Sequence, residues 1–255
     1  MQTIKKLYRV DYNGEDIITD LVYSGQEWAR TAEFVPNRIN NNQISNQAVV
    51  IGNGPSRLAL YSRANGDNIF TLLNTHKGGL LASGRLQSYG CNALARDFLP
   101  DFLVVNDHTV AQEYITRGIC DNNIVYATAE IVLDFPNKFY LIPQNPHWNA
   151  GTLATYLACF DGHTKIFFLG FDANSNESNV NYNVYTNTAG YQADASASTE
   201  AYFIKSLSMI MEVYNNVEFV RVMPDTSWYC PEQWKYHLNF RQISFNDFVI
   251  EADLG

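Results

Sequence analysis

The stretch Ala48-Val49-Val50-Ile51-Gly52-Asn53-Gly54-Pro55-Ser56 decides the fold of this 255-residue chain. Its four leading apolar residues predict a strand buried on both faces. Glycines then permit a tight turn whose backbone can approach a ligand closely, and proline suits the first turn of a helix. Amide groups at a helix start attract anions such as phosphate. We therefore expect a nucleotide phosphate to be bound by Gly52, Asn53, Gly54 and Ser56; a plain tight turn with a helix cap is the alternative.

This turn matches neither of the two common phosphate-binding loops. It lacks the GxGxxG spacing of dinucleotide-binding enzymes, and no Lys-Ser or Lys-Thr pair follows it as in a Walker A loop. The sequence therefore predicts neither a dehydrogenase nor a P-loop enzyme.

Further apolar runs follow the first one and are separated by intervals that suit helices. Residues 150–160 and 200–214 carry apolar side chains at helical spacing and predict two crossover helices. The alternation is typical of an α/β protein, so we predict a Rossmann-like, mostly parallel sheet with helices on both faces. Its remaining strands are expected at residues 102–105, 124–126, 139–142, 166–169 and 217–222.

Two segments differ from this pattern. Residues 1–48 contain the β-prone runs 7–10 and 17–19 around a turn at 11–14, which predicts an N-terminal hairpin and arm before a nucleotide-binding domain at 49–255. Residues 172–198 are rich in Asn, Ser, Ala and Tyr and are too long for an ordinary connection, so we expect a lid loop there.

Composition excludes several classes of function. A net charge of −9 with dispersed basic residues argues against binding to nucleic acid. No run is apolar for long enough to span a membrane, and the first residues lack the apolar core of a signal peptide, so we expect a cytoplasmic protein. The four cysteines have no zinc-site spacing, which favours free thiols in a reducing compartment, and a homo-oligomer is compatible with this composition.

Polar residues stand at the ends of the predicted strands. Asn106 and Asp107 follow the run at 102–105, at the carboxyl end of a parallel strand, where α/β proteins bind ligands. Asn92 lies in a similar context after Tyr89-Gly90-Cys91. Carboxamides can read a nucleobase or ribose through paired donors and acceptors, and turn or cap roles are the alternative.

The second half of the chain adds four candidates and several open roles. Gly151 and Thr152 open a small-residue helix whose amides could face a ligand, and Gly170 ends a strand just before Asp172. Asp172 could bind ribose, position an acceptor or cap the lid. The lid tyrosines Tyr182, Tyr185 and Tyr191 could hydrogen-bond a leaving phosphate or pack the loop. His147 and His237 are both candidates for a general base, and sequence does not choose between them.

These motifs in this order resemble the bacterial sialyltransferases of glycosyltransferase family 42. The resemblance spans about residues 49–227 and rests on the GNGPS turn, Gly90-Cys91-Asn92, Val105-Asn106-Asp107, Ala150-Gly151-Thr152, the run from Ile166 to Asp172 and Met223-Pro224-Asp225-Thr226-Ser227. It implies a CMP-sugar donor, with the nucleotide held by Asn53, Asn92, Asn106, Gly151 and Thr152 and the catalytic lid tyrosines at Tyr182 and Tyr185. The family places a catalytic histidine late in the lid, whereas this chain has no histidine between His163 and His237.

A second resemblance leads to a different chemistry. The strand-G-x-G-P-S turn, Leu99 to Asp107 and a later Gly-x-Asp are similar to MptE-like 6-hydroxymethylpterin pyrophosphokinases, and the run from Gly90 to Asp101 resembles proteins of tailed phages. The resemblance to the pyrophosphokinases implies ATP as the donor, with Mg²⁺ held by Asp107 and Asp172.

Three hypotheses follow. The leading one is a metal-independent transferase that uses a CMP-type sugar donor and a small-molecule or glycan acceptor. The second is pyrophosphoryl transfer, and the third is a nucleotide-binding or structural protein without turnover.

Overall fold

The chain is built around one eight-stranded parallel sheet. The computed structural model describes residues 2–10, 16–23, 28–30, 46–61, 70, 73, 86–143, 147–173, 183–191 and 200–254. The strand order of the large sheet is β11-β10-β9-β4-β5-β6-β7-β8, and a separate antiparallel sheet has the order β1-β2-β3. All seven pairings of neighbouring strands in the large sheet are parallel, which confirms the predicted Rossmann-like α/β class.

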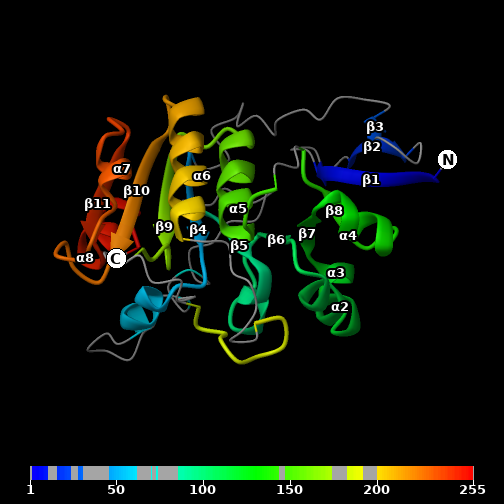
Figure 1. Cartoon of the computed structure of the whole chain (residues 1–255), viewed down its shortest axis with the longest axis horizontal. Helices are drawn as coiled ribbons and strands as arrows, with labels where there is room; N and C mark the ends of the chain where they lie inside the picture. Colours follow the sequence, from blue (N-terminus) through cyan, green and yellow to red (C-terminus); the bar gives the residue numbers. More distant parts are fainter. Residues whose placement is uncertain are drawn as a thin grey trace.

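The helices and strands follow one another along the chain with short connections between most of them (Figure 1). Their bounds are β1 Gln2–Val10, β2 Asp16–Tyr23, β3 Trp28–Arg30, β4 Gln47–Ile51, η1 Pro55–Tyr61, β5 Gln87–Cys91, η2 Asn92–Arg96, β6 Phe102–Val105, α2 His108–Thr116, α3 Ile119–Asn122, β7 Ile124–Ala127, α4 Ala129–Asp134, β8 Tyr140–Leu141, α5 Ala150–Phe160, β9 Lys165–Leu169, α6 Glu200–Val213, β10 Glu218–Met223, α7 Glu232–Lys235, β11 Phe240–Ser244 and α8 Phe245–Glu251.

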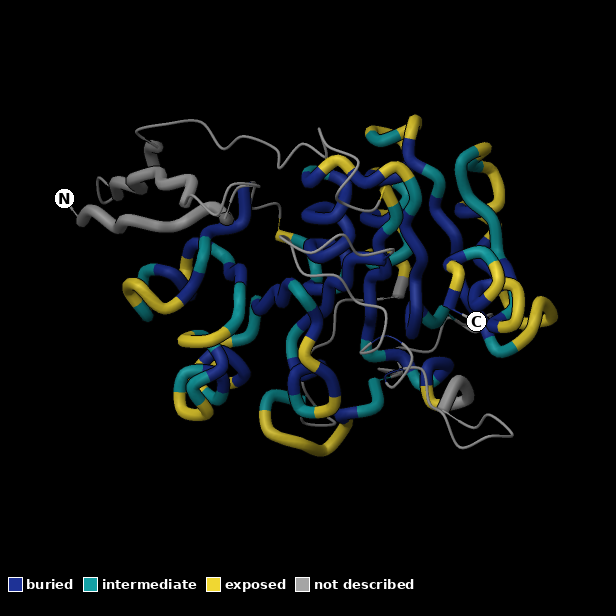
Figure 2. Tube along the Cα trace, turned by 180° about the vertical axis from the view of Figure 1, so that it is seen from behind, coloured by how far each residue is buried: buried dark blue, intermediate teal, exposed yellow. Residues whose placement is uncertain are grey.

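Both faces of the central strands are buried, as the continuous apolar runs predict. In β9, Ile166 and Phe168 belong to the core beneath α5 and α6, whereas Phe167 and Leu169 belong to the core on the opposite face. The ring of Phe167 meets that of Phe248 from α8 at 4.9 Å between centroids. Seen from behind, the middle of the sheet is buried along most of its length (Figure 2). Helices therefore cover both faces, which the sequence predicts.

The strand order reverses between β4 and β9. From β4 the chain adds β5, β6, β7 and β8 on one side, and β9, β10 and β11 then extend the sheet on the other. Ligands of open α/β sheets bind at the carboxyl edge near such a reversal. In Figure 1 this edge lies at the bottom, where η1, η2 and residues 183–191 gather. The fold thus brings the predicted site segments to one edge.

Two strands of the large sheet were missed by the sequence interpretation. β5 reads Gln-Ser-Tyr-Gly-Cys, yet all five residues are buried. The Ser88 hydroxyl is satisfied internally, because Ser88 Oγ donates to Asp101 Oδ2 at 2.9 Å, so this polar residue can lie in the centre of the sheet. β11 is an edge strand with mostly half-buried residues, which explains its weak apolar signal.

The N-terminal segment forms strands where the sequence predicts them. β1 and β2 pair antiparallel, and β3 adds a third strand that was not predicted. β1 lies beside β8 at the end of the large sheet (Figure 1). The predicted turn at 11–14 lies outside the described residues, and the domain boundary at 48 stays a prediction.

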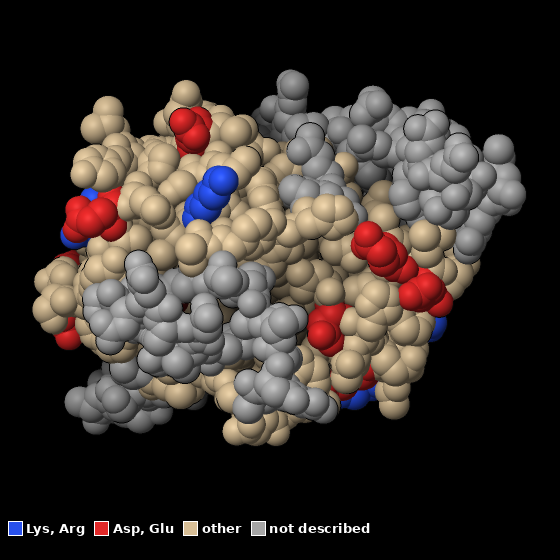
Figure 3. Space-filling model, in the orientation of Figure 1, with Lys and Arg blue, Asp and Glu red and all other residues tan. Residues whose placement is uncertain are grey.

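Charge is spread thinly over the surface. On the face shown in Figure 3, Asp and Glu side chains are scattered and the few Lys and Arg side chains are separate from one another. Among the described helices, none is long and apolar enough to cross a bilayer.

Candidate functional site

Two of the predicted asparagines bind each other at the carboxyl edge. Asn106 N–H donates to Asn92 Oδ1, and Asn92 Nδ2 donates back to Asn106 Oδ1, each at 3.1 Å. They meet because β5 and β6 are neighbouring parallel strands and each asparagine follows its strand. Asn92 has φ of 42°, in the left-handed region that asparagine tolerates, and Tyr114 OH donates to its carbonyl oxygen. The two carboxamides therefore form a mutual pair at the ends of β5 and β6, and their role toward a nucleotide stays a prediction.

The glycine turn is shaped by its contact with β9. Gly54 N–H donates to the carbonyl oxygen of Gly170 at 2.9 Å, and Gly52 N–H donates to that of Leu169 at 2.8 Å. A Cβ at Gly52 would lie 2.6 Å from Gly170 O, and a Cβ at Gly54 would lie 2.4 Å from Asp172 Oδ2. Gly170 itself has φ of 68°. These glycines are required by backbone-to-backbone packing, so their presence does not by itself indicate a ligand.

The expectation of a free amide at Ser56 is wrong. Ser56 N–H donates to Asp172 Oδ2 at 2.8 Å, and Ser56 is only 1% exposed. The segment that follows, η1, is a short 3-10 helix rather than an α-helix. Burial raises the pKa of Asp172 above its ordinary value, although the hydrogen bonds from Ser56 oppose that shift. Asp172 therefore caps the glycine turn at Ser56, a role that differs from the three considered from sequence.

Helix α5 places its amino terminus at the same edge. Asn149 is its N-cap and accepts from Thr152 N–H at 2.9 Å, while Asn106 Nδ2 donates to the carbonyl oxygen of Trp148 at 3.1 Å. The amides of Ala150 and Gly151 belong to the first turn and have no intrahelical acceptor. The positive end of an eleven-residue helix thus lies beside the paired asparagines.

Thr152 does not reach the ligand side of this helix. Its side chain is fully buried, donates to Asn149 Oδ1 at 3.1 Å and lies 3.2 Å from Ser206 Oγ of α6. The side chain therefore secures α5 to α6, and a nucleotide contact by Thr152 stays a prediction. Gly151 remains partly exposed at the helix start.

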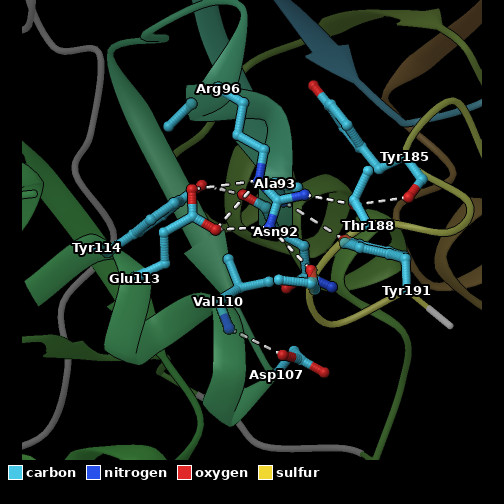
Figure 4. A network of polar contacts seen from close by, with 12 residues as sticks. Asn92, Ala93, Arg96, Asp107, Val110, Glu113, Tyr114, Tyr185, Thr188 and Tyr191 are labelled. Carbon is cyan, nitrogen blue, oxygen red and sulfur yellow. Dashed lines mark hydrogen bonds and ion pairs between the residues drawn. The ribbon is translucent and has the colours of Figure 1, made fainter. Parts of the chain in front are cut away.

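Residues 183–191, which we call the lid hairpin, close over this edge. Val184 N–H donates to Asn53 O at 2.8 Å. The phenol oxygen of Tyr191 lies 3.4 Å from both Asn53 Nδ2 and Ala93 N, and each nitrogen donates to it. Figure 4 shows Tyr191 beside Asn92 and Ala93. Asn53 Nδ2 also approaches Cys91 O at 3.5 Å. Among the described lid tyrosines, Tyr191 is the one that contacts the predicted asparagines.

Tyr185 lies on the other side of the lid hairpin. It is 6% exposed, and its hydroxyl group donates to Asp97 Oδ2 at 2.6 Å and accepts from Arg57 Nη2 at 2.8 Å. Burial raises the pKa of this phenol further above its ordinary value. These bonds hold Tyr185 against Asp97 and Arg57 and away from the paired asparagines. Tyr182 lies outside the described residues.

Two arginines that sequence reasoning missed hold the lid hairpin. Arg96 donates to Thr188 Oγ1 at 2.7 Å and to Ala189 O at 2.8 Å, and its other bonds go to the carboxylate of Glu113. This ion pair lowers the pKa of Glu113. Arg57 is fully buried beneath the turn. A basic residue directly after the GNGPS motif, in a chain with few basic residues, is the signal that could have identified it.

Asp107 has a structural partner as well. Its Oδ1 accepts from Val110 N–H at 2.9 Å and caps α2. A Cβ at Gly190 of the lid hairpin would lie 3.1 Å from the same oxygen, so the hairpin packs closely on this cap. Both carboxylates of the Mg²⁺ hypothesis, Asp107 and Asp172, therefore bind backbone amides. Across the described ranges, no group of three or more His, Cys, Asp or Glu side chains is arranged for a metal ion.

The two histidines considered as bases lie at different places. His147 is exposed immediately before Trp148, and its carbonyl oxygen accepts from Tyr202 OH at 2.6 Å. His237 follows α7 near the start of β11, where its backbone N–H donates to Trp234 O. His147 is therefore the nearer of the two to α5 along the chain.

A separate cavity of about 500 Å³ lies between β11 and the segment that follows β10. Buried Arg221 stands next to its wall and donates to Phe171 O, Tyr229 O and Gln242 Oε1. None of the predicted site residues lines the cavity, whose walls are formed by Thr226, Ser227, Trp228, Tyr229, Cys230, Lys235, Phe240, Arg241 and Gln242.

Comparisons with known proteins return similar structures but no sequence family. No protein-family model matches this chain. No curated protein matches it either. A variant of the α-2,3/8-sialyltransferase CstII shows 15% identity and a TM-score of 0.44 over 71% of this chain and 83% of its own.

Two further solved structures come from Campylobacter jejuni. CstII in complex with a substrate analogue, cytidine-5'-monophosphate, has 15% identity and a TM-score of 0.41 over 71% of this chain and 81% of its own. The α-2,3-sialyltransferase in apo form has 13% identity and a TM-score of 0.39 over 74% and 79%. The likeness is one of fold.

Proposed function

We propose that this chain is a nucleotide-sugar-dependent glycosyltransferase that binds a CMP-type donor at the carboxyl edge of β4, β5 and β6. One observation carries the proposal. Asn53, Asn92 and Asn106, which follow three neighbouring strands, gather beside the amino terminus of α5 and beneath Tyr191 of the lid hairpin. The motif resemblance to family 42 named the same three asparagines for the nucleotide.

The orientation of the carboxamides favours a ligand rich in acceptors. Asn92 Oδ1 and Asn106 Oδ1 are both used within the pair, and Asn53 Oδ1 accepts from Arg57 at 3.2 Å. Asn106 Nδ2 uses one of its two hydrogens on Trp148 O, so an N–H donor remains available to a ligand. Phosphate oxygens, ribose hydroxyls and the carbonyl of a pyrimidine are acceptors of the required kind.

Tyr191 marks a place where an oxygen atom fits. Its hydroxyl oxygen accepts from Asn53 Nδ2 and from Ala93 N–H. We propose that a phosphate oxygen of the donor takes this place and that the phenol then donates to the phosphate as it leaves. Burial raises the pKa of Tyr191, so the phenol keeps its proton at neutral pH and can donate it to a hydrogen bond.

The reaction itself would consist mainly of positioning and charge stabilisation. The acceptor hydroxyl attacks the anomeric carbon of the donor, the bond from that carbon to the phosphate oxygen breaks, and the phosphate leaves with the electron pair. The proton of the attacking hydroxyl passes to the departing phosphate, which is the strongest base that the step itself supplies. The amino terminus of α5 and neighbouring amide donors would stabilise the developing charge. Tyr191 replaces Tyr185 in our assignment because Tyr185 is held by Asp97 and Arg57.

Binding tests the first half of the proposal. We expect CMP without metal to raise the melting temperature, with about 2.7 kcal/mol of stabilisation at one hundred times its Kd. UMP, AMP, GMP and ATP with Mg²⁺ serve as comparisons. Asn106→Ala should weaken CMP binding at least tenfold, whereas Asn122→Ala, an exposed asparagine of α3, should leave it unchanged. A chain stabilised only by ATP with Mg²⁺, or by none of these nucleotides, refutes the proposal.

Turnover tests the second half. Incubation with CMP-sialic acid and a glycan acceptor should release CMP and form a glycosidic product, and Tyr191→Phe should lower kcat more than KM because its hydroxyl acts on the leaving phosphate. CMP binding without release of CMP would instead favour a nucleotide-binding protein that has no turnover.

A further inference from the structure

Arg57 connects the glycine turn with the lid hairpin. The residue is 0% exposed, although an arginine carries a charge at every physiological pH. We infer that Arg57 is a positioning residue that orients Asn53 and latches the lid hairpin at the same time. The nucleotide part of this inference rests on the proposed function, whereas the latch stands on contacts within the chain.

One half of the guanidinium group serves the turn. Arg57 Nη1 donates to Gly52 O at 2.8 Å and to Asn53 Oδ1 at 3.2 Å. With its carbonyl oxygen occupied in this way, the Asn53 side chain must direct its NH₂ group toward Cys91 O and Tyr191 OH. Arg57 thus decides that Asn53 presents donors rather than an acceptor to the ligand side.

The other half serves the lid hairpin. Arg57 Nη2 donates to Tyr185 OH at 2.8 Å and to Asp97 Oδ2 at 3.1 Å, and Tyr185 OH donates to the same carboxylate oxygen at 2.6 Å. The guanidinium carbon lies 5.2 Å from the centroid of the Tyr185 ring. The Arg57 guanidinium, the Asp97 carboxylate and the Tyr185 hydroxyl therefore form a closed ring of hydrogen bonds. Because Tyr185 belongs to the lid hairpin, this ring forms only when the hairpin is closed.

Because the charge of Arg57 is buried, the stability of this ring of hydrogen bonds depends on whether the lid hairpin is closed. Asp97, the carboxylate that pairs with Arg57, is 44% exposed, so solvent weakens that ion pair. Arg57 Nε has no hydrogen-bond partner among the described residues. Loss of the Tyr185 hydroxyl and ring would leave a buried cation less well satisfied, which is costly. The closed hairpin and the oriented Asn53 should therefore stabilise each other.

A ligand that binds oriented Asn53 should consequently favour the closed hairpin. The backbone adds to this link, since Val184 N–H donates to Asn53 O at 2.8 Å. One turn thus contacts the hairpin through its main chain, through Asn53 and through Arg57. No other described side chain bridges the turn and the hairpin with a charged group.

Hydrogen exchange of the full chain tests the latch directly. Tyr185→Phe removes one hydroxyl group and leaves the bonds from Arg57 to Gly52 and Asn53 intact. We expect exchange of the amides at 184–191 to become at least tenfold faster and CMP to bind at least threefold more weakly. Tyr214→Phe, immediately after α6, is the matched control and should change neither quantity, since its hydroxyl makes no hydrogen bond to a described residue.

Arg57→Lys completes a double-mutant cycle with Tyr185→Phe. Lysine keeps the positive charge but cannot donate to the glycine turn and to the lid hairpin from two separate nitrogens. Its effect on hairpin exchange should equal that of the double variant Arg57→Lys with Tyr185→Phe, since both act through one contact. Additive effects, or unchanged hairpin exchange in Tyr185→Phe, overturn the latch. A purely structural role would speed exchange throughout the sheet and not selectively in the hairpin. If the unaltered chain binds no nucleotide, the proposed function fails, yet these exchange measurements still decide the latch.

Discussion

Gly52→Ala should destabilise the protein because its backbone touches β9. The new Cβ would lie 2.6 Å from Gly170 O and 3.1 Å from Phe171 Cδ2. Such overpacking typically costs about 1–3 kcal/mol. The displaced turn would also weaken the hydrogen bond from Gly54 N–H to Gly170 O, which is worth about 1 kcal/mol. Reduced freedom of the unfolded chain offsets about 0.5 kcal/mol of this. We therefore expect a net loss of about 2.5 kcal/mol.

The assay is thermal and urea unfolding followed by far-UV circular dichroism. For a chain of this size, that loss corresponds to a fall of about 5–10 °C in the melting temperature. Gly151→Ala is the matched control, since its Cβ would lie 3.4 Å from the nearest atom, Asn149 Oδ1, and alanine suits a helix. Its stability should change by less than about 0.5 kcal/mol. If Gly52→Ala is as stable as this control, the close contact between β4 and β9 is refuted.

Three further outcomes follow from the described side chains. Asp172→Ala should cost about 1–3 kcal/mol by orphaning Ser56 N–H, whereas Asp172→Asn should melt no lower than the unaltered chain near pH 7. Burial raises the pKa of Asp172, so its ionisation lowers the stability of the folded chain as the pH rises, and the advantage of asparagine should vanish in acid. A lower melting temperature for Asp172→Asn than for the unaltered chain at neutral pH contradicts this. Arg241 lowers the pKa of Glu251 from 4.5 to about 2, so stability should fall as the pH drops through that window, and Glu251→Gln should flatten the acid limb of the melting curve. A thiol reagent near pH 8 should modify Cys120 first, because the other three cysteines are buried, and Cys120→Ser should abolish the fast phase.

The sequence predicted most of the fold because most of its strands are buried on both faces. Runs such as 102–105 and 166–169 are apolar throughout, and α5 spans the predicted residues 150–160. β5 escaped prediction because its serine is satisfied by Asp101, a pairing that depends on tertiary contact. β11 escaped because an edge strand carries less of the core.

The candidate site was predictable in its position but not in its partners. Strand ends could be located, so Asn53, Asn92 and Asn106 were found together. Hydrogen-bond partners distant in sequence could not be found, which is why the bond from Ser56 N–H to Asp172 was not among the roles predicted for Asp172. The roles of Arg57 and Tyr191 depend on where the lid hairpin folds back, 128 and 98 residues from their partners Tyr185 and Ala93.

The charges at the carboxyl edge determine how a nucleotide would be held. In the described part of the chain, Arg57 pairs with Asp97 and Arg96 pairs with Glu113, so neither cation is left to meet a phosphate. The remaining attraction comes from neutral groups, namely asparagine amides and the amino terminus of α5. Ion pairing with exposed cations weakens strongly as salt screens it, while short hydrogen bonds to neutral donors weaken little. We therefore expect the Kd for CMP to change less than about threefold between roughly 0.05 and 0.5 M NaCl by titration calorimetry. A steep salt dependence would require an unpaired cation in the site and would contradict a site built from neutral donors.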